Sequence, residues 1–272
     1  MIESRPIVIV RGVGDIGSAV AHRLFDAGFA VVVHDAPLPA TTRRGMAFTD
    51  AVFDGRALLA GVEAVRVDDR GGLSTVLAGS VAIPVVVTGF EPLLAVTAPA
   101  AIVDARMRKR IRAERQRGLA PLVVGLGPGF VAGETVDVAV ETSWEALGRV
   151  VERGPTLPLA GEPREIAGHA RDRYVYAPQA GIMRTGRAIG DLVLMGDIVA
   201  CLGAVELVAP LSGMLRGLTH DGVPVMTGTK VIEVDPRGPE AVVFGIGERP
   251  SRIAAGVLEA ITARYRIPPR SG

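Results

Sequence analysis

A glycine-rich stretch, Gly12-Val13-Gly14-Asp15-Ile16-Gly17, follows the apolar run 7–10 and precedes residues 16–27, whose apolar side chains have helical spacing. In this strand–turn–helix pattern the glycines permit a tight turn, a close approach of backbone N–H groups to a phosphate, and close packing of the helix on the sheet. Asp35 follows the next strand-like run, at the place where an acid binds the ribose of a dinucleotide. The pattern predicts a phosphate site at Gly12, Gly14 and Gly17.

Asp15 makes an ordinary dinucleotide site less favourable, because its carboxylate repels a pyrophosphate unless a metal or an arginine neutralises it. The same carboxylate is also a suitable charge for the first turn of a helix. A structural alternative stays open, in which the glycines serve only the tight turn.

A second glycine cluster, with Gly125, Gly127 and Gly129, follows the apolar run 122–124. Ligands of open α/β sheets bind beyond the carboxyl ends of the strands, so two such loops on one edge predict a crevice for an extended ligand that carries phosphate. The alternative is a tight loop that needs glycine for its backbone conformation alone.

Basic residues gather near the same predicted edge, where arginine is well suited to bind phosphate through two parallel hydrogen bonds. Lysine is rare in this chain, with Lys109 and Lys230 against 28 arginines. Residues 106–117 also fit a solvated basic helix, which is the structural alternative. The candidate residues are Arg43 and Arg44 after the second strand and Asp104, Arg106 and Lys109 after the fifth.

Short apolar runs alternate with helix-like stretches through the first half of the chain, which is typical of an α/β protein. We predict a Rossmann-like, doubly wound and mainly parallel sheet over residues 1–153, for binding a nucleotide or cofactor. A helix over 144–151 closes this domain, and a linker rich in proline and glycine covers 154–173. The predicted strands are 7–10, 29–33, 64–67, 83–87, 101–103, 122–124 and 136–140.

An internal repeat of 32 residues follows the linker, with eight identities that begin at Ala177/Ala209 and end at Val199/Val231. Such a period indicates a duplicated supersecondary unit, and we predict a small β domain over 174–236 with a C-terminal strand and helix over 237–272. The repeat resembles the half-repeat of biotinyl/lipoyl-type barrel-sandwich hybrid domains. Its central segment 200–208 has no lysine to modify, so neither biotin nor lipoate is expected. We expect Cys201 to be buried and Lys230 to face solvent.

The composition excludes several classes of protein. With 30 basic and 29 acidic residues the net charge is +1, which does not favour a nucleic-acid or membrane-surface binder. One cysteine and four scattered histidines give no metal-ligand spacing, so no metal site is expected. Without a recognisable signal or membrane span, the expected location is the cytoplasm. A homo-oligomer is compatible with this sequence.

Several long motifs resemble the YqeB-type family, described as accessory or maturation proteins of the selenium-dependent molybdenum hydroxylase system. They include VIVRGVGDIGSAVAHRLFDAGFAVVVHDAP, TTRRGMAFTDAVFDG, VDARMRKR, VVGLGPGFVAG and LRGLTHDGVPVMTGTKVIEVDPRG. The Rossmann-like part of that family is related to XdhC, an insertion factor for molybdenum-cofactor hydroxylases. The resemblance implies that the two glycine loops and the basic residues named above form the site. The chain departs from the family after Glu141-Thr142, within 157–168 and at 247–250, so selenium dependence stays open.

Three functions follow from these observations. The first is an accessory protein that binds the molybdenum cofactor or its nucleotide form, with a molybdenum hydroxylase as its client. The second is an NAD(P)-dependent oxidoreductase with Asp35 on the ribose, although no proton donor for a hydride site is evident. The third is a non-catalytic scaffold for the client enzyme.

Overall fold

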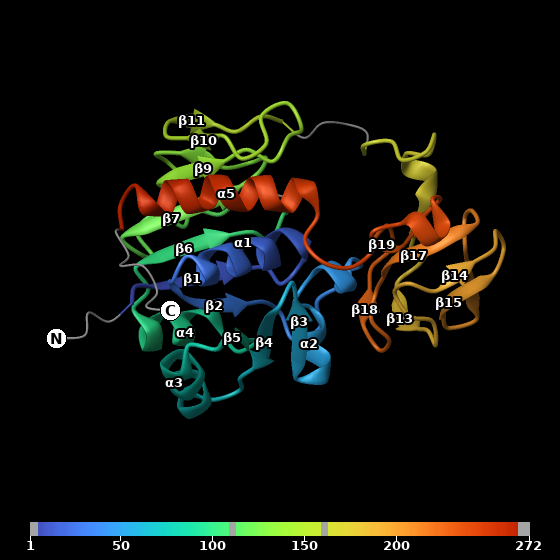
Figure 1. Cartoon of the computed structure of the whole chain (residues 1–272), viewed down its shortest axis with the longest axis horizontal. Coiled ribbons are helices and arrows are strands. Elements are labelled where there is room, and N and C mark those ends of the chain that lie inside the picture. Colours follow the sequence, from blue (N-terminus) through green and yellow to red (C-terminus); the bar gives the residue numbers. More distant parts are fainter. Residues whose placement is uncertain (1–4, 109–112, 159–162, 266–272) are drawn as a thin grey trace.

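The computed structural model describes residues 5–108, 113–158 and 163–265, which form a lobe around a large sheet and a smaller all-β lobe (Figure 1). The large sheet has nine strands in the order β10-β9-β7-β6-β1-β2-β5-β4-β3. The bounds of its strands are β1 Ile7–Arg11, β2 Ala30–His34, β3 Arg56–Leu59, β4 Val62–Arg66, β5 Ala82–Val86, β6 Ala101–Asp104, β7 Leu122–Leu126, β9 Val138–Val140 and β10 Val150–Val151.

Helices cover both faces of this sheet because its central strands are apolar on both sides. Val8 and Val10 of β1 pack in one core with α1 (Asp15–Asp26) and α5 (Glu248–Thr262). Ile9 points to the other face, where the core includes Leu73 of α3 (Arg70–Gly79) and Leu93 of α4 (Phe90–Thr97). Figure 1 shows α5 lying alongside α1, far from it in sequence. A short helix, α2 (Asp50–Asp54), precedes β3.

The fold-class prediction, a Rossmann-like sheet followed by a barrel-sandwich hybrid, is wrong. The sheet is mixed: β10 runs antiparallel to β9 at one edge, and β3 runs antiparallel to β4 at the other. The β3–β4 hairpin lies outside β5, so the strand order differs from the 3-2-1-4-5-6 order of a Rossmann fold. The physical reason for the error is that apolar runs indicate burial, whereas pairing direction at the edges depends on short turns such as Ala60-Gly61, where both residues have positive φ.

The all-β lobe consists of two four-stranded antiparallel sheets, β12-β19-β17-β14 and β16-β15-β13-β18. The repeat is visible in the strand positions, because β13, β14 and β15 begin at 181, 192 and 198 and β17, β18 and β19 begin 32 residues later at 213, 224 and 230. Each repeat contributes its middle strand to the sheet of the other. The bounds are β12 Tyr174–Tyr176, β13 Gly181–Arg184, β14 Leu192–Val193, β15 Ile198–Leu202, β16 Val205–Val208, β17 Gly213–Leu218, β18 Pro224–Val225 and β19 Lys230–Asp235.

The helix predicted over 144–151 is absent, and turns followed by β10 stand in its place. Gly148 has φ +78°, and a Cβ there would lie 2.3 Å from the carbonyl oxygen of Arg252 in α5. The close approach of this turn to α5 therefore prevents a helical path. The described part of 237–272 likewise holds a 3-10 turn (Gly238–Glu240) and α5, without the predicted strand.

The predicted linker contains short structured pieces in its described part. β11 (Gly154–Pro155) pairs with β8 (Val131–Ala132), and a 3-10 turn covers Arg171–Arg173. Residues 106–108 and 113–117 are not helical, so the solvated basic helix is wrong for the described part of 106–117. Among the residues that the structure describes, no helix has the length and apolar character to cross a membrane.

Candidate functional site

Charged side chains meet at the carboxyl ends of β1 and β6, two neighbouring parallel strands. Asp104 ends β6 and accepts hydrogen bonds from Arg106, with Nε 3.0 Å from Oδ1. Its Oδ2 accepts from Gln116 Nε2 at 2.5 Å and from Arg106 Nη2 at 2.5 Å. Arg11 ends β1 and donates from Nη1 to Gln116 Oε1 at 2.6 Å. Asp104 and Gln116 therefore hold both arginines at this edge.

Glu114 completes the cluster from the chain segment that precedes β7. Its Oε1 accepts hydrogen bonds from Arg11 Nη1, at 3.2 Å, and from Arg106 Nη2. Its Oε2 lies 4.0 Å from Nη1 of Arg108. Half of the Glu114 side chain is exposed, whereas the side chains of Arg11 and Arg106 are 10% and 13% exposed. The half-exposed carboxylate of Glu114 thus contacts the largely buried guanidinium groups of Arg11 and Arg106.

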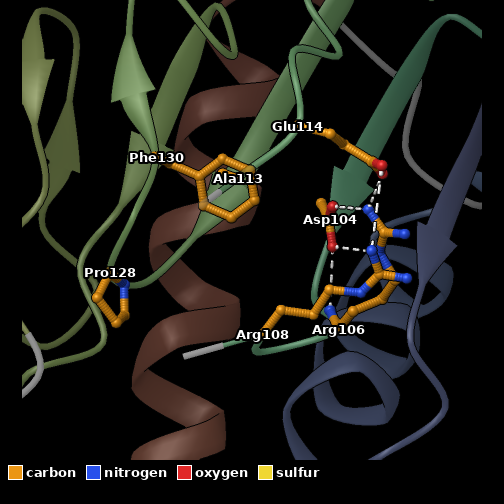
Figure 2. A pocket seen from close by; sticks show the side chains of 7 residues that line it. All are labelled: Asp104, Arg106, Arg108, Ala113, Glu114, Pro128 and Phe130. Atoms are coloured by element: carbon orange, nitrogen blue, oxygen red, sulfur yellow. Dashed lines mark hydrogen bonds and ion pairs between the residues drawn. The ribbon is translucent and has the colours of Figure 1, made fainter. Parts of the chain in front are cut away.

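Four of these side chains, those of Asp104, Arg106, Arg108 and Glu114, form one wall of a cavity of about 210 Å³. Figure 2 shows the charged cluster on one side and Phe130 and Pro128 on the other. The second glycine loop positions this apolar wall. Gly125 of β7 is paired with Asp104 of β6, and the chain continues from there through Pro128 to Phe130. The cavity therefore presents arginines opposite an aromatic ring.

The electrostatics of the cluster keep its acids ionised. Burial alone would raise the pKa of Asp104, but the hydrogen bonds and charge of Arg106 hold it below the ordinary value. The hydrogen bond from Arg106 likewise lowers the pKa of the Glu114 carboxyl. Burial, together with the charge of Arg106, lowers the pKa of Arg11, whose guanidinium also lies 3.7 Å from the centre of the Phe90 ring. Three positive charges, on Arg11, Arg106 and Arg108, thus lie close together with only two negative charges, on Asp104 and Glu114.

The first glycine loop has a different environment, because carboxylates of the chain accept two of its backbone N–H groups. Asp35 Oδ2 accepts the Val13 N–H at 2.7 Å, and its Oδ1 accepts the Ala36 N–H at 2.7 Å. Asp15 Oδ1 accepts the N–H of Ile16 at 3.0 Å. Gly17 packs so tightly that a Cβ there would lie 1.9 Å from the Gly12 oxygen. Asp35 thus fastens the loop where the sequence predicted a ribose contact.

Arg43 neutralises Asp15, with Nη1 3.1 Å from Oδ2, and connects it to the all-β lobe. The same guanidinium makes two hydrogen bonds to Glu233 of β19, at 2.9 and 3.0 Å. Glu233 is fully buried and also pairs with Arg173 at 3.2 Å and Lys230 at 3.0 Å. Burial would raise the pKa of Glu233, but Lys230 and Arg43 hold it far below the ordinary value. The loop is therefore tied across the two lobes by ion pairs.

The predicted site residues fall into two groups in the structure. Asp104 and Arg106 line the cavity, and the loop with Gly125, Gly127 and Gly129 flanks it. Gly12, Gly14, Asp15, Gly17, Asp35 and Arg43 belong to the fastened loop. Arg44 binds the carbonyl oxygen of Leu218 at 2.8 Å and Asp50 at 2.6 Å, so it joins the lobes. Lys109 lies outside the described residues.

Sequence reasoning missed Arg11, Glu114 and Phe130 at the cavity and Glu233 between the lobes. Arg11 had a signal, since it is a charged residue at the end of a buried strand. Lys230 was expected to face solvent, but it is half-buried, with Nζ 4.5 Å from the centre of the Tyr174 ring. Burial lowers the pKa of this amine. Cys201, expected to be buried, is partly exposed.

In the ranges that the structure describes, no three His, Cys, Asp or Glu side chains come together as they would around a metal ion.

Comparison with known proteins identifies a relative without an assigned activity. The chain is 40% identical over 267 residues to the uncharacterized protein YqeB of Escherichia coli strain K12, which covers 94% of this chain. The chain spans about half, 47%, of the length of that curated relative. No family model matches the chain. The similarity to YqeB agrees with the YqeB-type motifs and leaves the molybdenum hydroxylase context untested.

Solved structures give only distant similarity. A succinylglutamate desuccinylase/aspartoacylase from Rhodobacter sphaeroides is 26% identical over 31% of this chain and 29% of its own, with a TM-score of 0.22. The product-bound ectoine utilization protein EutE (DoeB) from Ruegeria pomeroyi is 12% identical over 85% of both chains, with a TM-score of 0.27. At these TM-scores the likeness supports no inference about activity.

Proposed function

We propose that the chain is an accessory protein of a molybdenum hydroxylase system, and that it binds a phosphate-bearing cofactor as cargo at the edge where β1, β6 and β7 end. The observation that carries the proposal is that Arg106 and Arg108 line one cavity and that Arg11 is bonded to Glu114 in the wall of that cavity. Guanidinium groups in this arrangement are suited to a phosphate. The cargo is the molybdenum cofactor or its nucleotide form, and the partner is the client hydroxylase.

The link with molybdenum hydroxylases comes from the motifs of the YqeB type. The similarity to YqeB over most of the chain supports the likeness to YqeB, and the molybdenum hydroxylase context is part of the proposal. The chemistry comes from the cavity. Three of the motif residues, Asp104, Arg106 and Arg108, lie in its charged wall. The proposal therefore places the family's basic motif at the phosphate of the cargo.

The size of the cavity fits a part of such a ligand. Pockets for drug-sized molecules have about 300–1,000 Å³, and this cavity has about 210 Å³. It therefore has room for a phosphate group with a small neighbouring moiety, and the rest of the cofactor extends outside it. A neighbouring hollow of about 480 Å³ shares Ala113 with the cavity and is lined further by Arg115, Gly133, Glu134 and Thr135.

The proposal is tested by titrating the protein with isolated molybdenum cofactor and with inorganic pyrophosphate in a calorimeter. Replacing Arg106 by Ala removes a charged hydrogen-bond donor, which contributes about 1.5–3 kcal/mol. We therefore expect the affinity for both ligands to fall by about 10- to 100-fold. Arg106→Lys, which keeps the charge and loses the planar fork, should fall between Arg106→Ala and the unaltered protein.

The matched control is Arg187→Ala, because Arg187 is an exposed arginine of the all-β lobe that lies 3.9 Å from Asp197. It should bind like the unaltered protein. Circular dichroism of each variant verifies the fold. Equal affinity of Arg106→Ala and Arg187→Ala would overturn the proposal.

A further inference from the structure

The cavity of the proposed function has a carboxylate in its wall, that of Glu114, on which Arg11, Arg106 and Arg108 converge. Glu114 bonds Arg11 and Arg106 through one oxygen and faces Arg108 with the other. In geometry this is how arginine side chains bind an anionic ligand. Because half of the Glu114 side chain is exposed, it can turn outward into solvent without crossing the protein interior.

Arg11 and Arg106 would keep their positions after Glu114 had left. Arg106 retains two side-chain hydrogen bonds to Asp104, and Arg11 retains its hydrogen bond to Gln116 and its stacking on Phe90. Asp104 and Gln116 are themselves buried, with 3% and 1% exposure. A preorganised set of donors loses little conformational freedom when it binds a ligand.

The charge balance of these described residues indicates what would replace the carboxylate. Arg11, Arg106 and Arg108 carry three positive charges, and Asp104 and Glu114 carry two negative ones. With Glu114 displaced, the three arginines face Asp104 alone, which leaves two positive charges. A phosphate monoester carries about −1.5 to −2 at pH 7, whereas a phosphodiester or a sulfate ester carries −1.

We infer that Glu114 occupies the position of the ligand's phosphate, and that the ligand displaces it with a terminal phosphate monoester. This inference rests on the proposed function and narrows it. A terminal phosphate monoester brings about two charges on a single phosphate, whereas each phosphate that is esterified on both sides brings only one. Phe130 and Pro128, across the cavity from the arginines, provide an apolar surface for a ring next to the phosphate (Figure 2).

Two probes of nearly the same shape separate charge from fit. Phenyl phosphate is a dianion and phenyl sulfate a monoanion, and each is titrated calorimetrically at pH 7.5 into the full chain. We expect phenyl phosphate to bind at least tenfold more tightly than phenyl sulfate. Glu114→Gln keeps the size of the side chain and removes its charge, so both probes should bind at least fivefold more tightly to it. Glu206→Gln, an exposed acid of β16, is the matched control and should leave both affinities unchanged.

Equal affinities for the two probes, or an unchanged affinity of Glu114→Gln for both, would overturn this inference. The proposed function would still stand in that case if pyrophosphate binds. If neither phenyl phosphate nor pyrophosphate binds to any of these proteins, the proposed function fails together with the inference.

Discussion

The two glycine loops of the large sheet, one after β1 and one after β7, differ in what faces them. The first loop is fastened: Asp35 takes the N–H of Val13, and Asp15 is paired with Arg43. The second loop carries Pro128 and Phe130 to a cavity whose other wall consists of arginines. An anion can therefore enter the second site by displacing one half-exposed carboxylate, Glu114, whereas the first loop is held by ion pairs to a buried carboxylate.

The difference shows that glycine spacing alone does not distinguish a ligand loop from a structural turn. Both loops follow buried strands and both need glycine at close contacts. What separates them is the exposure of the chain's own carboxylates: Glu114 at the cavity is half exposed, whereas Glu233, which holds Arg43 against Asp15 at the first loop, is fully buried. The variants below, from the largest expected effect to the smallest, test the fastened loop against the second one.

Glu233→Gln should have the largest effect, because it leaves Arg43, Arg173 and Lys230 buried around a neutral side chain. Removing one partner of a buried ion pair costs about 3–5 kcal/mol. We expect the free energy of unfolding in urea to fall by that amount. The affinity of the cavity for pyrophosphate should stay unchanged in the folded variant, since Glu233 holds Arg43 at the first glycine loop and does not line the cavity. A loss of affinity would mean that the two regions act as one site.

The same carboxyl gives a pH dependence. Its pKa in the folded protein is far below the unfolded value of about 4.3, so its contribution to stability is fully present above that pH. The contribution is lost as the pH falls below about 4.3 towards the lower, folded-state pKa. Unfolding free energies measured between pH 6 and pH 3 should therefore fall less steeply in Glu233→Gln than in the unaltered protein.

Gly17→Ala should cost about 3 kcal/mol, near the upper end for overpacking. The new methyl group would lie 1.9 Å from the backbone oxygen of Gly12, so the helix must move away from the loop. Thermal unfolding measures the loss. The control is Gly14→Ser, because the contact closest to a Cβ at Gly14 is an ordinary 3.7 Å to Thr41 and serine is favoured at a helix N-cap. Gly14→Ser should change the stability by only a few tenths of a kcal/mol.

Asp35→Ala should cost about 1–2 kcal/mol, because the half-buried carboxylate accepts two backbone N–H groups. Pyrophosphate affinity at the cavity should be unaffected. The decisive control is NAD: if NAD stabilises the unaltered protein against heat and fails to stabilise Asp35→Ala, then the first loop binds a dinucleotide and the contrast between the loops disappears.

Much of the large sheet could be predicted from the sequence because parallel strands that are buried on both faces consist of continuous apolar residues. Runs at 7–10, 101–103 and 122–124 correspond to β1, β6 and β7. The edges could not be predicted, because β3 and β10 are short and their pairing depends on turns. The turn at Gly148 is an example, since its conformation is set by contact with α5, about a hundred residues further along the chain.

The site shows the same division between local and distant information. Asp104 and Arg106 could be found because they follow a strand directly. Glu114 and Gln116 approach them from another segment, without a pattern that marks them. Glu233 was missed for the same reason: its partner Arg43 is 190 residues away in the sequence.

The return of α5 to the large sheet has a consequence for how the molecule is made. Ile253, Val257 and Ile261 belong to the same core as Val8 and Leu24, so one side of that core is still missing when the ribosome has finished the strands of the sheet. Chains are synthesised from the N-terminus and domains fold as units. The all-β lobe is therefore synthesised in full before α5 can complete the core of the large sheet. The part of the molecule that is translated first thus completes its core last.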